Sequence, residues 1–233
     1  MITVRKAEDR GTSRIGWLDS HHTFSFSDYH DPRHMGFRSL RVINDDTVAA
    51  GAGFGTHGHR DMEIITYVLD GALAHSDSIG TGSVIRPGDV QKMSAGSGIR
   101  HSEFNHSQTD PVHFLQIWII PDRAGVQPGY QQLNFPRETK VGKLVLVASN
   151  EKREDLIHIE QDAKMYVTLL ESSEQTVSHT LAAGRHAWIH VATGSVVVNG
   201  QTLRAGDGAA ITDEATIEIS GSPAGEVILF DLG

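Results

Sequence analysis

Short runs rich in β-branched and aromatic residues, each closed by a turn, constrain the fold of this chain more than any other feature. Such runs cover residues 63–69, 113–120, 143–148, 164–170, 186–192 and 226–232. Turn sequences such as Asp70-Gly71 and Asn199-Gly200 lie between them. Helical periodicity is scarce, and the best helix candidate, residues 151–156, is short. Many short strands at this spacing predict an all-β sandwich or barrel.

An internal repeat indicates two copies of one β-barrel unit. In the first half a strand runs to Gly71, and an Arg-x-Gly-Asp turn follows at residues 86–89. In the second half a strand runs to Gly194, and the same turn pattern follows at residues 204–207. Pro and Gly residues interrupt regular structure around residues 122–137. We therefore expect an N-terminal domain over residues 1–130 and a C-terminal domain over residues 131–233.

Composition excludes several classes of function. The chain has 29 acidic and 20 basic residues, a formal net charge of −9, which predicts no direct binding to nucleic acid or to an anionic membrane. No apolar run approaches the ~20 residues that a spanning helix needs. The absence of cysteine excludes disulfides, thiolate zinc sites and cysteine nucleophiles. No signal peptide is visible after Met1, so we expect a cytoplasmic protein.

Two histidine-containing pairs suggest a metal site. His57 and His59 are two residues apart, and so are His101 and Glu103. Residues i and i+2 of a strand point to the same face, so each pair can converge on one ion. Three imidazoles and one carboxylate would leave open positions on a metal with five or six ligands, as metal catalysis requires. With 14 histidines, a His-x-His pattern can also arise by chance.

The residues around these pairs resemble the two cupin motifs. Gly51 precedes His57 by six residues, a Pro-Gly-Asp turn follows at residues 87–89, and Asn105 lies four residues after His101. The resemblance implies an all-β bicupin, two jelly-roll β-barrels in one chain, with a divalent metal in a barrel. Glu63 departs from the motif because it lies eight positions before Gly71. An extra residue reverses the facing of a strand position, so we expect Glu63 to point elsewhere and Glu103 to be the better ligand candidate.

Other segments resemble the pirin family. They include residues 16–20, 23–26, 35–37, 40–46 and 93–103. The resemblance, closest to bacterial pirins with quercetin 2,3-dioxygenase activity, implies that His57, His59, His101 and Glu103 ligate one divalent metal, usually iron. Manganese, cobalt, nickel, copper and zinc suit the same ligands. It also implies a dioxygenase that cleaves flavonols such as quercetin with O2 and releases CO. Glu103 is the candidate catalytic residue, since it could accept the proton of a bound hydroxyl.

The second half of the repeat lacks the metal-binding residues. Aligning Gly194 with Gly71 places Thr180 and Ala182 opposite the first histidine pair. We therefore expect a degenerate C-terminal barrel without a metal site, in which His179, His186 and His190 are packing or surface residues. In the first half, His75 and Gln116 could line the pocket; a buried, hydrogen-bonded histidine is an equal alternative for His75.

Two other functions remain open at this stage. The chain could be a redox-sensitive, metal-binding regulatory protein with a protein partner and no dedicated substrate. It could also be a cupin isomerase or lyase that acts on a small acid or sugar, because fold does not fix function. Two fused barrels can bury their mutual interface within one chain, so we expect a monomer.

Overall fold

The computed structural model describes all 233 residues and divides them into two compact units. The N-terminal unit comprises residues 11–134 and 151–161, and the C-terminal unit comprises residues 1–10, 135–150 and 162–233. The units therefore differ from a single cut after residue 130. Residues 1–10 belong with the second half because strand β1 (Ile2–Arg5) pairs with β19 (Gly208–Ile211). The domain assignment to residues 1–130 and 131–233 remains a proposal.

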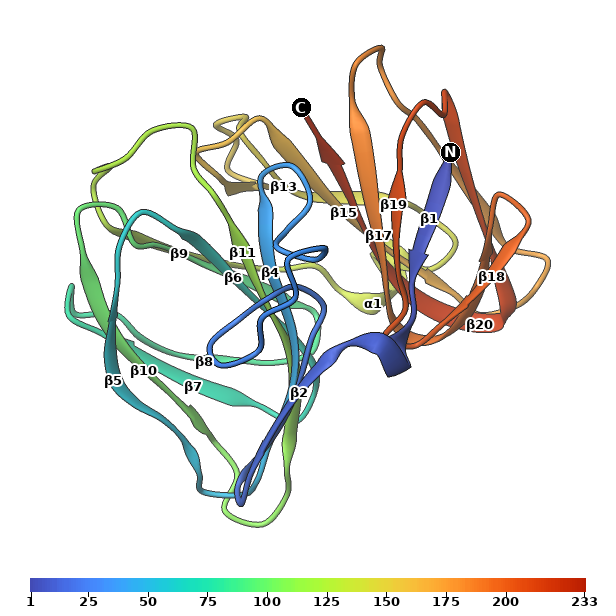
Figure 1. Ribbon diagram of the computed structural model, residues 1–233. Coiled ribbons are helices and arrows are strands. Elements are labelled where there is room, and N and C mark those ends of the chain that lie inside the picture. Colours follow the sequence, from blue (N-terminus) through green and yellow to red (C-terminus); the bar gives the residue numbers. More distant parts are fainter. The chain divides into compact units, whose positions relative to one another are not determined.

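The N-terminal unit consists of two antiparallel sheets (Figure 1). The four-stranded sheet has the order β5-β10-β7-β8, and its strands are Gly53–His59, Ile99–Asn105, Leu73–Asp77 and Gly82–Ile85. The seven-stranded sheet has the order β12-β9-β6-β11-β4-β3-β2. Its strands in that order are Gly129–Asn134, Asp89–Ser94, Glu63–Asp70, Val112–Ile119, Leu40–Val48, Leu18–His22 and Gly11–Ile15. A two-residue strand, β14 (Ile157–His158), completes the unit.

Alternation along the strands decides which side chains face the interior of this unit. In β10, Ile99, His101, Glu103 and Asn105 are buried, whereas Arg100 and Phe104 are exposed. Strand β6, which pairs with β9 and β11 inside the seven-stranded sheet, is buried at six consecutive positions. The core under the four-stranded sheet is formed by apolar residues that include Val68, Leu73, Ile85, Val112 and Phe114.

The C-terminal unit is built on one large antiparallel sheet with its own core. The strands follow the order β1-β19-β17-β20-β15-β13, with β16 paired to β20 and β18 paired to β17. The strands not yet given are β17 (His186–Val198), β20 (Thr216–Leu232), β15 (Ala163–Leu170), β13 (Val145–Ser149), β16 (Thr176–Thr180) and β18 (Gln201–Arg204). Two short helices belong to this unit, the 3₁₀ turn η1 (Ala7–Asp9) and α1 (Arg137–Lys140).

The all-β prediction is confirmed, and each expected strand run lies within or overlaps a strand of the structure. The sheets form jelly rolls and do not close into a single barrel. The helix expected over residues 151–156 is absent because that segment forms bends and turns; the chain's α-helix is α1. No helix is long and apolar enough to cross a membrane.

Candidate metal centre

Strands β5 and β10 bring the two histidine-containing pairs together. Backbone pairing places His101 directly opposite His57 and Ile99 opposite His59. His57 and His59 are half-buried, whereas His101 is buried. Because i and i+2 share a face, these side chains project to the same side of the sheet. We call His57, His59 and His101 the three-histidine cluster; one ring nitrogen from each lies within 4.8 Å of the other two.

The geometry of the three-histidine cluster suits a metal ion. The Nε2 atoms of His57 and His101 are 3.0 Å apart. Two nitrogens bound at ~2.1 Å and at right angles would be separated by about 3.0 Å. The His57 Nδ1–H donates to the Gly55 carbonyl at 2.8 Å, which leaves Nε2 as the ring nitrogen that faces the cluster.

Burial favours the neutral form of His59 and His101. Desolvation, with a smaller contribution from the neighbouring His57, lowers the pKa of His59 to about 4. Desolvation and the neighbouring imidazoles lower the pKa of His101 to about 2. A neutral imidazole retains the lone pair that a metal ion needs, so both rings are ready to bind a cation at neutral pH.

Glu103 points into the same interior from β10 and is held by the opposite sheet. Gln116 Nε2 on β11 donates to both carboxylate oxygens, at 2.9 and 3.2 Å. Burial raises the pKa of Glu103 to about 7, against the effect of hydrogen bonds from Gln116 and Thr66. Its carboxylate does not join the three-histidine cluster at 4.8 Å; instead it forms a second group with His75 and His101.

Glu63 points away from the cluster, as the extra residue in its motif predicted. Its Oε2 lies 3.6 Å from Lys92 Nζ and accepts a hydrogen bond from Ser94 Oγ at 3.1 Å. Thr66 on the same strand contacts Glu103 and Gln116. Positions 63 and 66 have opposite parity, so the two side chains lie on opposite faces of β6.

A cavity of about 530 Å³ opens beside the three-histidine cluster. Its lining contains more apolar than polar surface, contributed by residues that include Trp17, Leu18, Phe26, Phe54 and Trp118. Trp118 contacts His59 edge to face at 5.0 Å between ring centroids and packs against Phe26 at 5.4 Å. His22, Asn44 and Asp46 add a polar wall from β3 and β4.

Sequence reasoning missed several of these residues. Of the two residues that the sequence offered as pocket lining, Gln116 does line the cavity. The other, His75, is a buried histidine whose Nε2 lies 3.2 Å from Asp77 Oδ2. Thr66, Asp46 and Trp118 were not singled out, because only the strand register shows which way each side chain points. Burial raises the pKa of Asp46 to about 7, and its Oδ1 has no hydrogen-bond partner.

These residues fit a divalent ion with mixed nitrogen and oxygen ligands. Neutral imidazoles and a carboxylate suit iron, manganese, cobalt, nickel, copper or zinc. The cavity provides space beside the cluster for a substrate of the size of a small organic molecule. The arrangement can therefore support metal-assisted chemistry on a bound, largely apolar ligand.

Comparison with known proteins covers the whole chain and confirms the two-cupin prediction. The family model described as pirin matches residues 3–119, and the model of the quercetinase C-terminal cupin domain matches residues 146–232. Quercetin 2,3-dioxygenase of Escherichia coli K12 is 50% identical over 232 residues, covering 100% of this chain and 99% of that protein. A putative quercetin 2,3-dioxygenase of Pseudomonas aeruginosa is 43% identical and covers 100% of both chains.

Solved structures agree over the full length. The crystal structure of YhhW from Escherichia coli is 48% identical, with a TM-score of 0.95, and the match covers 100% of this chain and 98% of that one. A second structure shows this bacterial pirin, YhhW, in complex with nickel(II), with a TM-score of 0.94 and 48% identity over 100% and 99% of the two chains.

Proposed function

Because the chain belongs to the pirin family, we propose that it is a metal-dependent dioxygenase that cleaves flavonols such as quercetin with O2 and releases CO. The observation that carries this proposal is the three-histidine cluster beside a buried carboxylate at one wall of a largely apolar cavity. The relatives from Escherichia coli and Pseudomonas aeruginosa, a quercetin 2,3-dioxygenase and a putative one, support the same reaction class.

One divalent ion would be held by His57, His59, His101 and Glu103. The neutral rings and the 3.0 Å separation of two Nε2 atoms support this assignment. We propose Fe(II) as the native ion; the nickel complex of YhhW shows that a relative binds nickel, and manganese, cobalt, copper and zinc suit the same donors. When bound, such an ion supplies Lewis-acid chemistry that lowers the pKa of a coordinated hydroxyl.

Glu103 is the proposed general base. A carboxylate oxygen of Glu103 takes the proton of the 3-hydroxyl of the flavonol, which leaves an electron-rich ring for attack by O2. Burial raises the pKa of the Glu103 carboxyl, which favours proton acceptance, and a bound ion would keep the carboxylate ionised until the hydroxyl arrives. Gln116 positions the carboxylate by donating to both of its oxygens.

The cavity wall would bind and shield the substrate. Trp118, Phe26 and Phe54 offer flat apolar surface for an aromatic ring system. Their burial of the substrate excludes water, which limits the hydrolysis of reactive intermediates. Asn44 and Asp46 lie on the polar wall, where they can accept hydrogen bonds from phenolic hydroxyls.

The test is anaerobic reconstitution with Fe(II), followed by addition of quercetin and O2. Flavonol absorbance and released CO are followed for the wild-type protein, for His57→Ala and for His101→Ala. His106→Ala is the matched control, because His106 is exposed and lies outside the cavity. We expect loss of absorbance with release of CO in the wild type and the control, and neither in the two cluster variants.

Tight Fe(II) binding without quercetin turnover would overturn this proposal and favour the partner-binding, redox-sensitive alternative.

A cytoplasmic monomer that needs no nucleic acid completes the proposal. It is supported by the formal charge of −9, which disfavours nucleic-acid binding. Light scattering of the purified metal-loaded protein checks the monomer, and a dimer mass would contradict it.

A further inference from the structure

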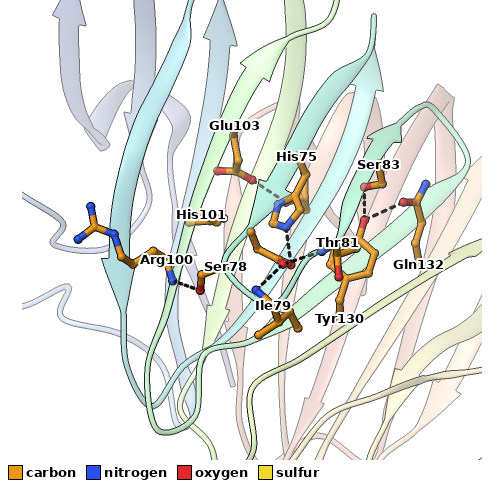
Figure 2. Close-up of polar contacts among 12 residues, drawn as sticks. His75, Ser78, Ile79, Thr81, Ser83, Arg100, His101, Glu103, Tyr130 and Gln132 are labelled. Atoms are coloured by element: carbon orange, nitrogen blue, oxygen red, sulfur yellow. Dashed lines mark hydrogen bonds and ion pairs between the residues drawn. The ribbon is translucent and has the colours of Figure 1, made fainter.

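Two residues with buried side chains, His75 and Asp77, lie on β7, the strand next to the one that carries His101 of the three-histidine cluster. Backbone pairing places His75 opposite Glu103 and Asp77 opposite His101. Both β7 side chains are completely excluded from solvent. Figure 2 shows the ring of His75 beside His101, between Glu103 and the turn that carries Ile79 and Thr81. The β7 pair and the cluster therefore share the interior face of one sheet.

Asp77 fixes which nitrogen of His75 carries hydrogen. Its Oδ1 accepts backbone N–H groups from Ile79 at 3.0 Å and Thr81 at 2.9 Å, and its Oδ2 lies 3.2 Å from His75 Nε2. A carboxylate only accepts hydrogen bonds, so His75 must donate from Nε2. The lone pair of the neutral ring then lies on Nδ1, which is buried and has no hydrogen-bond partner. His75 therefore offers a buried acceptor.

His101 offers the complementary donor once a metal is bound. His57 donates from Nδ1 to Gly55, so its Nε2 is an acceptor, and His101 Nε2 donates to it in the metal-free protein. An ion bound at Nε2 of His101 needs that lone pair, so the ring must carry its hydrogen on Nδ1 instead. His101 Nδ1 is also buried and without a hydrogen-bond partner.

We propose that His75 accepts the Nδ1–H of His101, so that the Asp77–His75 pair holds His101 in the tautomer that binds metal at Nε2. The ring centroids of the two histidines are 5.3 Å apart. One nitrogen of each lies within 4.8 Å of the other and of a Glu103 oxygen. That separation suits a hydrogen bond carried through one water, because neither Nδ1 has a direct partner in the structure. His75 and Asp77 are thus positioning residues for the ligand His101.

This inference rests on the proposed ion at the three-histidine cluster, and metal binding tests it without any substrate. Affinity for Ni(II) is measured by competition with a chromogenic chelator. We expect His75→Leu, which removes the acceptor, to weaken binding about 10–100-fold, the usual effect of losing an outer hydrogen bond to a ligand. His75→Asn is the matched variant, because its side-chain oxygen can replace Nδ1 as acceptor, and we expect it to bind within about threefold of wild type.

Asp77→Asn tests the direction of the hydrogen bonds. The Asn oxygen can still accept the two backbone N–H groups, but its amide donates to His75 Nε2. His75 Nδ1 then carries hydrogen and opposes His101 Nδ1–H. We expect Ni(II) affinity to fall as far as in His75→Leu, while urea unfolding of the metal-free variant confirms that it folds.

Histidine ¹⁵N spectra of the wild type provide a measurement that no folding defect can disturb. In the Zn(II)-loaded protein we expect His101 to carry hydrogen on Nδ1 and His75 to carry it on Nε2. Hydrogen on Nδ1 of His75, or unchanged Ni(II) affinity in both His75→Leu and Asp77→Asn, would overturn the inference. A second ion per chain, present in the wild type and lost only in those two variants, would also overturn the inference. Failure of the cluster to bind any ion would instead overturn the proposed function.

Discussion

The side-chain amide of Gln116 donates to both carboxylate oxygens of Glu103, and so links the two sheets across the cavity. Thr66 Oγ1 lies 3.1 Å from Gln116 Oε1 and 3.4 Å from Glu103 Oε1. Thr66 has a single hydroxyl hydrogen, which it donates over the shorter distance to Gln116 Oε1. The Gln116 amide is thereby oriented with its NH₂ group toward Glu103. The proposed fourth ligand is thus positioned by residues of the opposite sheet.

Replacing Gln116 should therefore impair metal binding without unfolding the protein. Gln116→Met keeps the length of the side chain but removes both donors to Glu103. We expect Ni(II) affinity and quercetin turnover each to fall about 10–100-fold, as is typical for loss of an outer contact to a ligand. Gln201→Met, at an exposed position, is the control. Wild-type affinity in Gln116→Met would show that Glu103 needs no support from the opposite sheet.

Close backbone contact at Gly53 makes the pairing of β5 and β10 sensitive to a single methyl group. A Cβ at Gly53 would lie 2.3 Å from the Glu103 carbonyl oxygen, whereas a Cβ at Gly55 would meet nothing within 4 Å. We expect Gly53→Ala to destabilise the protein by about 1–3 kcal/mol and to weaken metal binding. Gly55→Ala should do neither. Urea unfolding and Ni(II) titration of the two variants measure the contrast, and equal behaviour would contradict it.

The buried pair of Lys92 and Glu63 should support stability rather than catalysis. Lys92 Nζ donates to Ser94 Oγ at 2.6 Å and lies 3.6 Å from Glu63 Oε2. Lys92→Met leaves a buried carboxylate uncompensated, so we expect a loss of about 3–5 kcal/mol in the free energy of unfolding at pH 7. Lys92→Met combined with Glu63→Gln should recover most of it. Metal affinity of the double variant should equal that of the wild type; a loss would indicate that Glu63 acts as a ligand.

The strands and the histidine pairs could be predicted from the sequence because both follow local rules. His57 with His59, and His101 with Glu103, share a face through the two-residue period of a strand. The structure adds the register that places His101 opposite His57. It also shows a bulge in the pairing of β5 with β10, which places Glu103 opposite Phe54 rather than Gly55. Neither the register nor the bulge has a signal in the residues between the pairs.

Contacts between distant segments could not be predicted in the same way. Strand β1 joins the C-terminal unit because Ile2 pairs with Ile211, and no local pattern specifies a partner at that separation. Gln116 lies in an apolar run, where only the register with β4 and β6 decides that it faces the cavity. The role of His75 could not be predicted because it depends on Asp77. Asp77 in turn is oriented by two backbone N–H donors of the following loop.

Metal stoichiometry tests the proposed difference between the two repeats. The alignment of Gly194 with Gly71 places Thr180 and Ala182 opposite the first histidine pair. In the C-terminal unit His179 Nε2 lies 2.8 Å from Asp231, whose carboxylate also accepts from Arg185. We expect one Zn(II) per chain by elemental analysis after dialysis, and none in the double variant His57→Ala/His101→Ala. One ion retained by that variant would place a site elsewhere in the chain.

Asp46 should make stability depend on pH in the opposite direction from a paired carboxylate. Burial raises its pKa from 3.8 to about 7, so the folded protein binds this proton more tightly than the unfolded chain does. Stability is therefore lost through Asp46 as pH rises from about 4 to about 7, and the loss is complete above that range. Asp46→Asn removes the titration and keeps the shape of the side chain.

We therefore expect the advantage of Asp46→Asn over wild type to grow as the pH is raised. Between pH 5 and pH 8 the difference in the free energy of unfolding should increase by up to about 3 kcal/mol, since each pKa unit corresponds to about 1.4 kcal/mol. Urea unfolding of the metal-free proteins at several pH values measures it. Asp110→Asn, at an exposed position, controls for the general effect of removing a charge. A constant or shrinking difference for Asp46→Asn would mean that this carboxyl is ionised in the folded protein at acidic pH, with a partner in its buried surroundings that compensates the charge.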